Sequence, residues 1–391
     1  MKFSVLLPTR NRLDLLKYAL ETVLRQDYAD WEVIISDNFS DQDIATYIQS
    51  IGDTRIKYFR TQSFVPVTEN WNNALKQSSG DYIIMLGDDD CIMQGYFSTV
   101  AKLIEKYDHP DFIYTDAFLY AYPGVMPGFK KGFLQFSYAR FFDASRQPVI
   151  MQAEEAHALV RQSVNFTVSF GFNMQHSLVN RKFIESIRSV GEFFQSPYPD
   201  YYASNVLFLT AKRILIYPQP LVTIGISPKS FGFYYFNDRE DDGVKFLKNV
   251  ADADITQRVE HVILPGTNMN TSWLLAMETI SKNFGDQFPL RVNYARYRWL
   301  QLLHLLTHIN KLRLQETWKR LFLWEKLTYG SVLFLVYIAS RFFPQRLRPK
   351  ALAKFASLYS PYPRSDPQRR DIEYQNILEV FEQVEPRREQ S

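Results

Sequence analysis

Along the first 120 residues, two patterns of apolar and polar positions alternate. Phe3–Leu7 is a short apolar run of the kind that predicts a buried strand, and it ends at Pro8. Leu13–Leu24 instead repeats apolar residues three or four positions apart, which predicts an amphipathic helix. Further strands are predicted at Trp31–Ser36, Ile56–Phe59 and Tyr82–Leu86, and further helices at Ile44–Ile51, Thr68–Gln77 with Thr68 as N-cap, and Gln94–Tyr107. This alternation predicts an α/β fold with a mostly parallel sheet flanked by helices.

The pattern changes twice beyond this point. Between 121 and 270 aromatic residues and prolines are frequent and the strands look short. We expect helices at Ala153–Arg161, Ser177–Ile187 and Ala203–Ala211, a strand at Ile214–Tyr217 and a loop at Pro218–Tyr235. From 271 to 356 the spacing of apolar residues is mostly helical. The tail 357–391 contains prolines and one short amphipathic stretch, Ile372–Val384.

The composition supports a folded chain with an uneven charge. Hydrophobic residues make up 46% of the 391 positions and aromatic residues 16%, which is enough for a sizeable core. The net charge is only +3, but 291–356 contains thirteen Lys and Arg against two acids. Cys91 is the only cysteine, so no intrachain disulfide can form. The start Met1–Pro8 has too short an apolar run for a signal peptide, so we expect a cytoplasmic protein.

Polar residues gather where three of the predicted strands end. Thr9–Arg12 follows the first strand, Asp37 the second, and the triplet Asp88–Asp90 the fourth. The carboxyl ends of parallel strands are where α/β sheets bind their ligands. Three adjacent carboxylates repel one another, and a hard divalent cation such as Mg²⁺ or Mn²⁺ would relieve that repulsion. A solvated acidic turn is the alternative interpretation of the triplet.

Three segments around these residues resemble, in the same order, the family 2 glycosyltransferases. They are Val5–Arg12, Ile34–Asp41 and Gly80–Asp90. The resemblance is firm over 1–115, weaker to 235 and absent beyond. It implies a GT-A-type fold in which 1–120 binds a nucleotide sugar and 121–270 binds the acceptor, followed by a basic helical extension, 271–356, and the tail 357–391.

The resemblance also implies roles for residues that would bind the donor. The loop after the first strand would wrap the nucleobase, and Asp37 would hydrogen-bond to that base, usually uracil. Lys229, in a loop that follows a later predicted strand, would contact the diphosphate, although a solvated lysine is the alternative. The loop residues concerned are Pro8, Thr9, Arg10 and Asn11.

The Asp triplet corresponds to the metal-binding motif of that family. Asp88 would face the ribose and the metal ion, Asp90 would bind the metal ion, and Asp89 would belong to the donor site. Many family members have their first aspartate at the position of Gly87, so the division of ligands within the triplet stays open. The expected cofactor is Mn²⁺ or Mg²⁺, a Lewis acid for the departing diphosphate.

Sugar transfer also needs a base, because the acceptor hydroxyl must lose its proton as it attacks. Asp200 precedes the predicted helix Ala203–Ala211 and resembles the family's catalytic aspartate at a helix start. A simple N-cap is the alternative role, and Pro199 stands where the family often has Glu. Asp116 and Glu192 are weaker candidates for the base. His176 would line the acceptor site, unless it is a structural histidine.

The basic segment contains an apolar stretch, Leu327–Ala339, that is too short for a confident transmembrane helix. Its flanks are rich in Lys and Arg and carry Trp318, Trp324, Phe342 and Phe343. Such flanks suit a helix on an anionic membrane surface, which would place the protein peripherally on the inner face. A buried helix with a solvated basic surface is the alternative. No motif for nucleic-acid recognition accompanies the charge.

The expected function is therefore a metal-dependent, inverting glycosyltransferase. It would move a sugar from a nucleotide diphosphate sugar, with uridine as the expected nucleoside, to a hydroxyl of a glycan or lipid-linked glycan. A nucleotidyltransferase is one rival, but it would need a Gly-rich loop near the N-terminus, and Pro8–Arg12 contains no glycine. A non-catalytic module that binds nucleotide sugars is the other rival.

Overall fold

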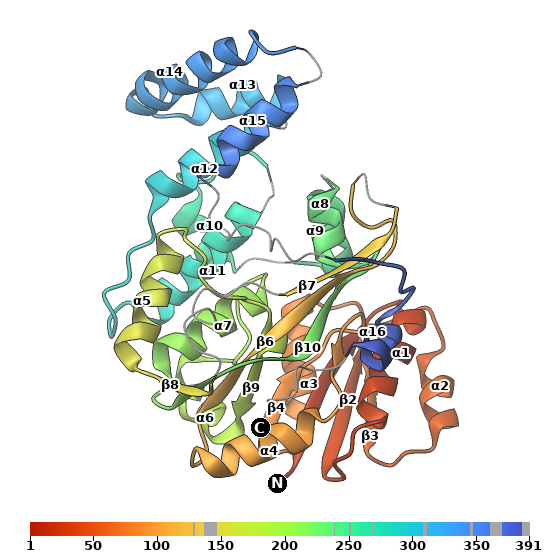
Figure 1. Cartoon of the computed structure of the whole chain (residues 1–391). Coiled ribbons are helices and arrows are strands. Elements are labelled where there is room, and N and C mark those ends of the chain that lie inside the picture. The colour runs from red at the N-terminus through yellow and green to blue at the C-terminus, as the bar shows by residue number, and fades with distance from the viewer. Residues whose placement is uncertain are drawn as a thin grey trace. The chain divides into compact units, whose positions relative to one another are not determined.

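Figure 1 shows the computed structural model of the whole chain. The residues described are 1–127, 130–136, 147–237, 239–249, 252–266, 269–307, 311–344, 347–359 and 370–384. The chain forms two compact units. Unit 1 comprises 1–160, 170–250 and 364–391, and unit 2 comprises 161–169 and 251–363. The predicted boundaries at 120 and 270 divide the chain by expected role. The compact units instead divide it near 250, and only 364–391 of the predicted tail belongs to unit 1.

Unit 1 begins with the predicted alternation of strands and helices. The elements are β1 (Phe3–Thr9), α1 (Leu13–Leu24), β2 (Trp31–Asp37), α2 (Ile44–Ile51), β3 (Ile56–Arg60), α3 (Val67–Gln77), β4 (Tyr82–Met85) and α4 (Tyr96–Lys106). The strands lie in the order β3-β2-β1-β4 and all three pairings are parallel. The α/β fold is therefore confirmed, and the sequence located each of these elements to within two residues.

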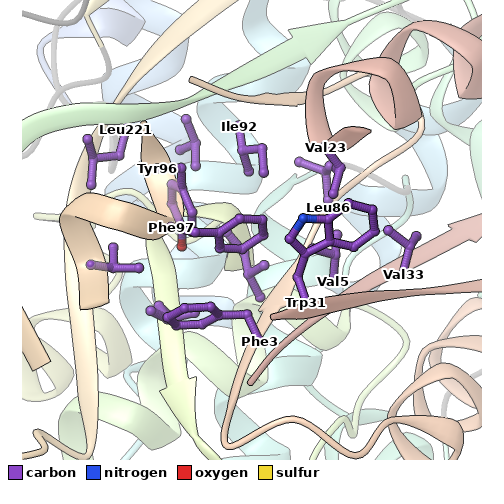
Figure 2. Close-up of a cluster of buried hydrophobic side chains, with 14 of the residues drawn as sticks. Phe3, Val5, Val23, Trp31, Val33, Leu86, Ile92, Tyr96, Phe97 and Leu221 are labelled. Atoms are coloured by element: carbon purple, nitrogen blue, oxygen red, sulfur yellow. The ribbon is translucent and has the colours of Figure 1, made fainter. Parts of the chain in front are cut away.

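One large hydrophobic cluster of this half packs against one face of the sheet. Alternate residues of β1 and β2, Phe3 and Val5 with Trp31 and Val33, point to this face and are buried with helices α1 and α4. Figure 2 shows these side chains packed with Phe97 of α4, whose ring stacks on Phe3 with centroids 5.1 Å apart. Burial of apolar surface contributes roughly 25 cal/mol per Å², so this cluster fixes the strand register on which the site depends.

The remaining strands make the sheet mixed. They are β5 (Cys91–Ile92), β6 (Phe112–Ala121), β7 (Gly132–Phe136), β8 (Val149–Met151), β9 (Ser177–Asn180), β10 (Ile214–Ile226) and β11 (Arg370–Ile372). Strand β9 inserts antiparallel between β4 and β6, while β10 runs parallel to β6. The parallel arrangement predicted for the sheet holds for β1 to β4, and most later pairings are antiparallel.

Three local predictions are wrong. Ser177–Ile187 is not one helix but β9 followed by α6 (Arg181–Ser186), because Asn180 interrupts the segment and its side chain caps α6 through the N–H of Lys182. The strand predicted to end at Tyr217 continues through the first half of the predicted loop. Pro218 and Pro220 are tolerated because the pairing of β10 with β6 is irregular between Tyr217 and Val222. A residue without an N–H can stand there without breaking a regular inter-strand hydrogen bond. Thr68 is not the N-cap of α3, since Pro66 holds that position.

The remaining helices of unit 1 surround the later strands. They are α5 (Ala153–Val164), of which the last residues belong to unit 2, α7 (Pro199–Thr210), α8 (Phe231–Phe236), α9 (Glu240–Leu247) and α16 (Ile377–Gln383). The amphipathic stretch predicted in the tail, Ile372–Val384, contains α16, and its first residue is the last of β11. Strand β11 pairs with β7, and α16 packs against α1, as Figure 1 shows. Ile377, Val380 and Phe381 are buried there.

Unit 2 is helical in its described part, as predicted for the C-terminal extension. Its helices are α10 (Ala253–Val259), α11 (Met269–Phe284), α12 (Tyr294–Thr307), α13 (Lys311–Arg320), α14 (Leu323–Ser340) and α15 (Arg348–Ser357). A buried ion pair links two of them: Arg298 of α12 contacts Glu325 of α14 at 2.6 Å. Within the described residues, no helix combines the length and apolar content needed to span a bilayer.

Candidate active site

The carboxyl ends of β1 and β2 form the first edge of the site. Thr9 and Asp37 are partners in the parallel register, and the N–H of Asn38 donates to the carbonyl of Thr9 at 2.9 Å. Asn11 has φ of 54°, a left-handed conformation that Asn tolerates. Its N–H donates to Ser40 Oγ at 2.9 Å. The two loops that follow these strands are therefore fixed to each other.

Asp37 is buried and organises this edge through protein partners. Its Oδ1 accepts from the N–H of Ser40 at 2.9 Å, and its Oδ2 accepts from the Tyr58 hydroxyl at 2.6 Å. Arg60 lies 3.7 Å from the same Oδ2. Burial, together with the Asp37 carboxylate, raises the pKa of Tyr58, so the phenol remains a donor. Recognition of a nucleobase by Asp37 stays a prediction.

Arg10 is held between aromatic rings beside this edge. Its guanidinium lies 3.8 Å from the centre of the Phe64 ring and 5.8 Å from that of Phe246 on α9. The buried Nε of Arg10 has no hydrogen-bond partner. Contact of Arg10 with the donor stays a prediction.

The triplet follows β4 and is joined to the loop after β1. The Thr9 hydroxyl donates to Asp88 Oδ2 at 2.7 Å, and Arg12 Nη1 donates to Asp88 Oδ1 at 2.8 Å. Burial raises the pKa of Asp88, while the Arg12 charge opposes that effect and Asp89 adds to it. Thr9 thus belongs to both edges, since it pairs with Asp37 in the sheet and bonds to the triplet.

Asp90 points into the protein. Its Oδ2 accepts from the N–H of Gly87 at 2.8 Å and from the side-chain amide of Gln175, and its Oδ1 accepts from the N–H of Gly225 at 2.7 Å. Burial and the neighbouring Asp89 charge raise the pKa of Asp90 to about 8, although these three donors oppose the rise. Both oxygens of this predicted metal ligand therefore have protein donors.

Asp89 differs from its two neighbours. Its Oδ2 accepts from the Ser227 hydroxyl at 2.6 Å, and no donor among the described residues reaches its Oδ1. Strand β10 approaches the triplet closely here, because a Cβ at Gly225 would lie 1.9 Å from the carbonyl oxygen of Asp89. Only glycine fits at that position.

The triplet offers oxygen ligands of the type that Mg²⁺ and Mn²⁺ prefer. In the described part of the chain, no group of three or more His, Cys, Asp or Glu side chains is arranged to hold a metal ion alone. Mg²⁺ usually takes one or two carboxylates and completes its shell with substrate phosphates and water. The open oxygen of Asp89, beside Asp88, fits that mode of binding.

Lys229 also reaches the donor loop. Its ammonium donates to the carbonyl of Asn11 at 3.0 Å and lies 3.3 Å from Asp14. Its own backbone carbonyl accepts a hydrogen bond from Arg12. The structure therefore brings Lys229 to the loop after β1, and Arg12 is the cation that contacts the triplet.

Asp200 lies in the first turn of α7. Tyr198 is the N-cap of this helix and Pro199 its first residue, so the N-cap role considered for Asp200 is wrong. The Asp200 Oδ1 accepts from the N–H of Tyr201 at 3.0 Å. Burial raises the pKa of Asp200 to about 7, which suits a group that takes up a proton near neutral pH.

The segment before Asp200 is held by α3. The Thr68 hydroxyl donates to the carbonyl of Ser196 at 2.6 Å, and the Asn72 side chain bonds to both the carbonyl and the N–H of Phe194. On its other side α7 contacts the short helix Met174–His176, which carries Gln175, the partner of Asp90. These contacts tie the start of α7 to the elements around the triplet.

His176 lies in the protein interior. Its side chain is buried, its ring stacks on Tyr114 with centroids 5.0 Å apart, and its Nδ1 lies 2.8 Å from the Thr115 carbonyl. A Cβ at Gly171 would lie 2.2 Å from its Nε2. Burial lowers the pKa of His176 to about 4, so the ring is neutral. This environment favours the structural interpretation over contact with an acceptor.

The two weaker base candidates differ from Asp200. Glu192 is exposed and pairs with Lys76 at 3.0 Å on the surface. Asp116 is buried and its Oδ1 accepts from the N–H of its neighbour Ala117 at 2.8 Å.

The structure adds residues that the sequence did not single out. Arg12 lies in a segment that resembles the family, so the sequence contained a signal for it. Gln175 had none, because His176 beside it is the chemically more prominent residue. Gly225 lies in β10 and Ser227 directly after it, and both fall within the segment that was predicted as a loop.

Comparison with known proteins finds one family that matches part of the chain. Residues 4–164 match the family described as "Glycosyl transferase family 2". A Campylobacter jejuni protein named GalNAc(5)-diNAcBac-PP-undecaprenol beta-1,3-glucosyltransferase is 40% identical over 112 residues, which are 28% of this chain and 36% of that protein. An Escherichia coli protein named UDP-Glc:alpha-D-GlcNAc-diphosphoundecaprenol beta-1,3-glucosyltransferase WfgD is 30% identical over 87 residues, 22% of this chain and 34% of that protein. The chain thus spans about a third of the length of each of these relatives.

Among solved structures, one similar chain is S. aureus TarS 1–349 in complex with UDP-GlcNAc. It has 14% sequence identity and a TM-score of 0.46, over 98% of this chain and 91% of that chain.

Proposed function

Because residues 4–164 match the glycosyl transferase family 2, we propose that the protein transfers a sugar from a nucleotide diphosphate sugar to an acceptor hydroxyl. One observation carries the proposal. Thr9 pairs with Asp37 in the sheet and donates to Asp88, so the nucleobase edge and the acidic triplet belong to one site. A nucleotide sugar has a base at one end and a diphosphate at the other, and it needs both edges.

The donor is proposed to be a uridine diphosphate sugar. Arg12 places a cation on Asp88, and Arg10 and Lys229 add positive charge at the loop after β1. A diphosphate that enters this site would meet positive side chains on one side and require a cation on the other. The E. coli relative is named for UDP-Glc, which supports uridine as the nucleoside.

Mn²⁺ or Mg²⁺ is the proposed cofactor, held by Asp89 with Asp88 as its neighbour. When bound, the ion would supply Lewis-acid stabilisation of the negative charge that grows on the leaving diphosphate. Arg12 would hold Asp88 in place through its ion pair, and Ser227 would orient Asp89. Asp90 would shape the turn from within, since Gly87, Gln175 and Gly225 already occupy its oxygens.

Asp200 is the proposed general base. With a pKa of about 7 it is partly ionised at neutral pH and can accept the proton of the acceptor hydroxyl. A base on the acceptor side and a leaving diphosphate on the opposite side of the sugar give direct displacement, which inverts the anomeric carbon.

The acceptor class is proposed to be a lipid-linked glycan. Both relatives are named for acceptors in which a sugar is joined to undecaprenol through a diphosphate, and both are named as β-1,3-glucosyltransferases. Glucose from UDP-glucose is therefore the first donor to test.

The decisive experiment measures sugar transfer from a panel of nucleotide sugars, with Mn²⁺ or Mg²⁺, to undecaprenyl-diphosphate-linked sugars. Asp200→Asn should lose transfer by at least about 100-fold while donor binding by calorimetry is retained. Glu192→Gln is the matched control, and it should transfer at the normal rate. Equal loss in both variants would remove Asp200 as the base, and no transfer with any donor would favour the non-catalytic module.

A further inference from the structure

Helix α14 has an unusual surface. Between Lys326 and Arg341 it contains no charged residue. Positions 325, 329, 333 and 336 form the stripe that faces unit 2, where Tyr329 and Leu333 pack on the small core of Leu264, Leu302 and Leu321. A surface helix normally carries polar residues opposite such a stripe. In α14 the opposite side is also largely apolar.

The outer side of α14 and its flanks concentrate the exposed apolar surface of the protein. Twenty large hydrophobic side chains of the described residues are exposed, and fourteen of them lie between 318 and 358. On the helix itself Leu327 is 66% exposed, Phe334 62% and Leu335 64%. The other exposed members on α14 are Leu323, Trp324, Val332, Tyr337 and Ile338. Contiguous patches of this kind mark surfaces that are covered in the functional state.

The exposed face belongs to a firmly anchored helix. Glu325 is buried, accepts from Arg298 through both carboxylate oxygens at 2.6 Å, and also accepts from the N–H of Phe322. Arg298 bonds in turn to the carbonyls of Val262 and Arg320. The start of α14 is thus fixed to unit 2, and its outer face is a constant feature of that unit.

We propose that this outer face docks unit 2 onto an anionic lipid surface, with α14 lying in the interface between head groups and acyl chains. The uncharged stretch from 327 to 340 would span about 21 Å as a helix, less than the ~30 Å of a hydrocarbon core. Exposed Trp318 and Trp324 on one flank and Phe342 on the other suit the interfacial layer.

The positive charge of 291–356 favours an anionic lipid surface, rather than a second copy of the chain, as the partner that covers the outer face of α14. The region 291–356 has thirteen Lys and Arg against two acids, and Lys326 and Arg341 bracket the apolar stretch. Two copies that met through this face would bring two strongly positive surfaces together. Anionic head groups would instead neutralise those charges while acyl chains cover the apolar side chains.

The test is sedimentation of the full chain with vesicles. The protein should bind vesicles of phosphatidylcholine with phosphatidylglycerol at least tenfold more strongly than vesicles of phosphatidylcholine alone, and added salt should weaken binding. The double variant Leu327→Asp/Leu335→Asp should reduce binding to anionic vesicles by at least tenfold. Both residues are exposed, so its melting temperature should match that of the normal protein.

Val149→Asp is the matched control, since Val149 is an exposed apolar residue of unit 1. It should bind vesicles normally. Light scattering on size-exclusion fractions tests the rival occupant of this face, a second copy of the chain. The proposal would be overturned in favour of a dimer if the normal protein is dimeric and does not bind vesicles, and if the double variant is monomeric. A monomer that ignores both kinds of vesicle would also overturn it. Vesicle binding is measured without a sugar donor, so either result leaves the proposed transfer reaction to its own test.

Discussion

Buried carboxylates at the two ends of the parallel strands have opposite pKa shifts and different numbers of cationic partners. Near the amino end of the strands, Glu32 is buried but contacts both Lys2 and Lys57 at 2.7 Å, and these cations with its hydrogen bonds hold its pKa well below the usual range. At the carboxyl end, the triplet Asp88–Asp90 has one close cation, Arg12, and burial raises the pKa of Asp88 and Asp90. A structural site is neutralised by its own protein, whereas a binding site is left with charge for its ligand.

The largest effect is expected from removing the carboxylate with an open oxygen. Asp89→Asn should lower metal-dependent sugar transfer by about 100- to 1,000-fold, because a transition-state charge would lose part of its stabilisation. Rates with saturating Mn²⁺ measure the effect. The melting temperature without metal should not fall. If transfer survives in Asp89→Asn but not in Asp88→Asn, the division of roles within the triplet must be reversed.

Glu32→Gln tests the structural end of the same comparison. It should cost about 2 kcal/mol of unfolding free energy, less than a fully buried pair, because both lysines are partly exposed. Urea unfolding measures the cost, and transfer should change less than twofold. The lowered pKa of Glu32 gives stability that is present at neutral pH and is lost as pH falls below the value of an unfolded glutamate. The difference between the two proteins should therefore shrink below about pH 4.

The pH profile of transfer reports on Asp200. Its pKa is raised to about 7, and only the ionised form can accept a proton, so the rate should rise with pH and level off above 7. Between pH 6 and pH 5 the rate should fall about tenfold. The profile is measured under kcat/KM conditions at fixed metal concentration. An unchanged rate across this range would exclude Asp200 as the titrating base.

The smallest effect is expected at Gln175, which supports the triplet from within. Gln175→Ala should cost about 1 kcal/mol of stability and reduce transfer a few fold, since one of three donors to Asp90 is lost. Gln195→Ala is a suitable control, because the Gln195 amide donates to the backbone carbonyls of Val190 and Glu192 rather than to the triplet. Thermal melting and transfer rates distinguish the two variants.

The sequence predicted the half of the fold in which local pattern and tertiary environment agree. Strands β1, β2 and β4 are buried apolar runs, and their ends position Thr9, Asp37 and the triplet as expected. The prediction of one helix at Ser177–Ile187 was wrong because strand β9 is specified by its two neighbours in the sheet, β4 and β6, rather than by its own apolar spacing. The sequence did not predict the partners of the triplet for a related reason, since Gln175 and Ser227 come close to it only when distant parts of the chain fold together.

Gly225 has a consequence for how this chain can be divided. The glycine and Ser227 hold two of the three aspartates, and both come from β10 or the residue after it, far along the chain from the recognisable motifs. A gene fragment that stops at residue 164 would encode the three segments Val5–Arg12, Ile34–Asp41 and Gly80–Asp90 and still lack the residues that hold two of their carboxylates. Expressing that segment alone would therefore produce the motifs without a complete site, and a fragment meant to bind the donor must extend at least through Ser227.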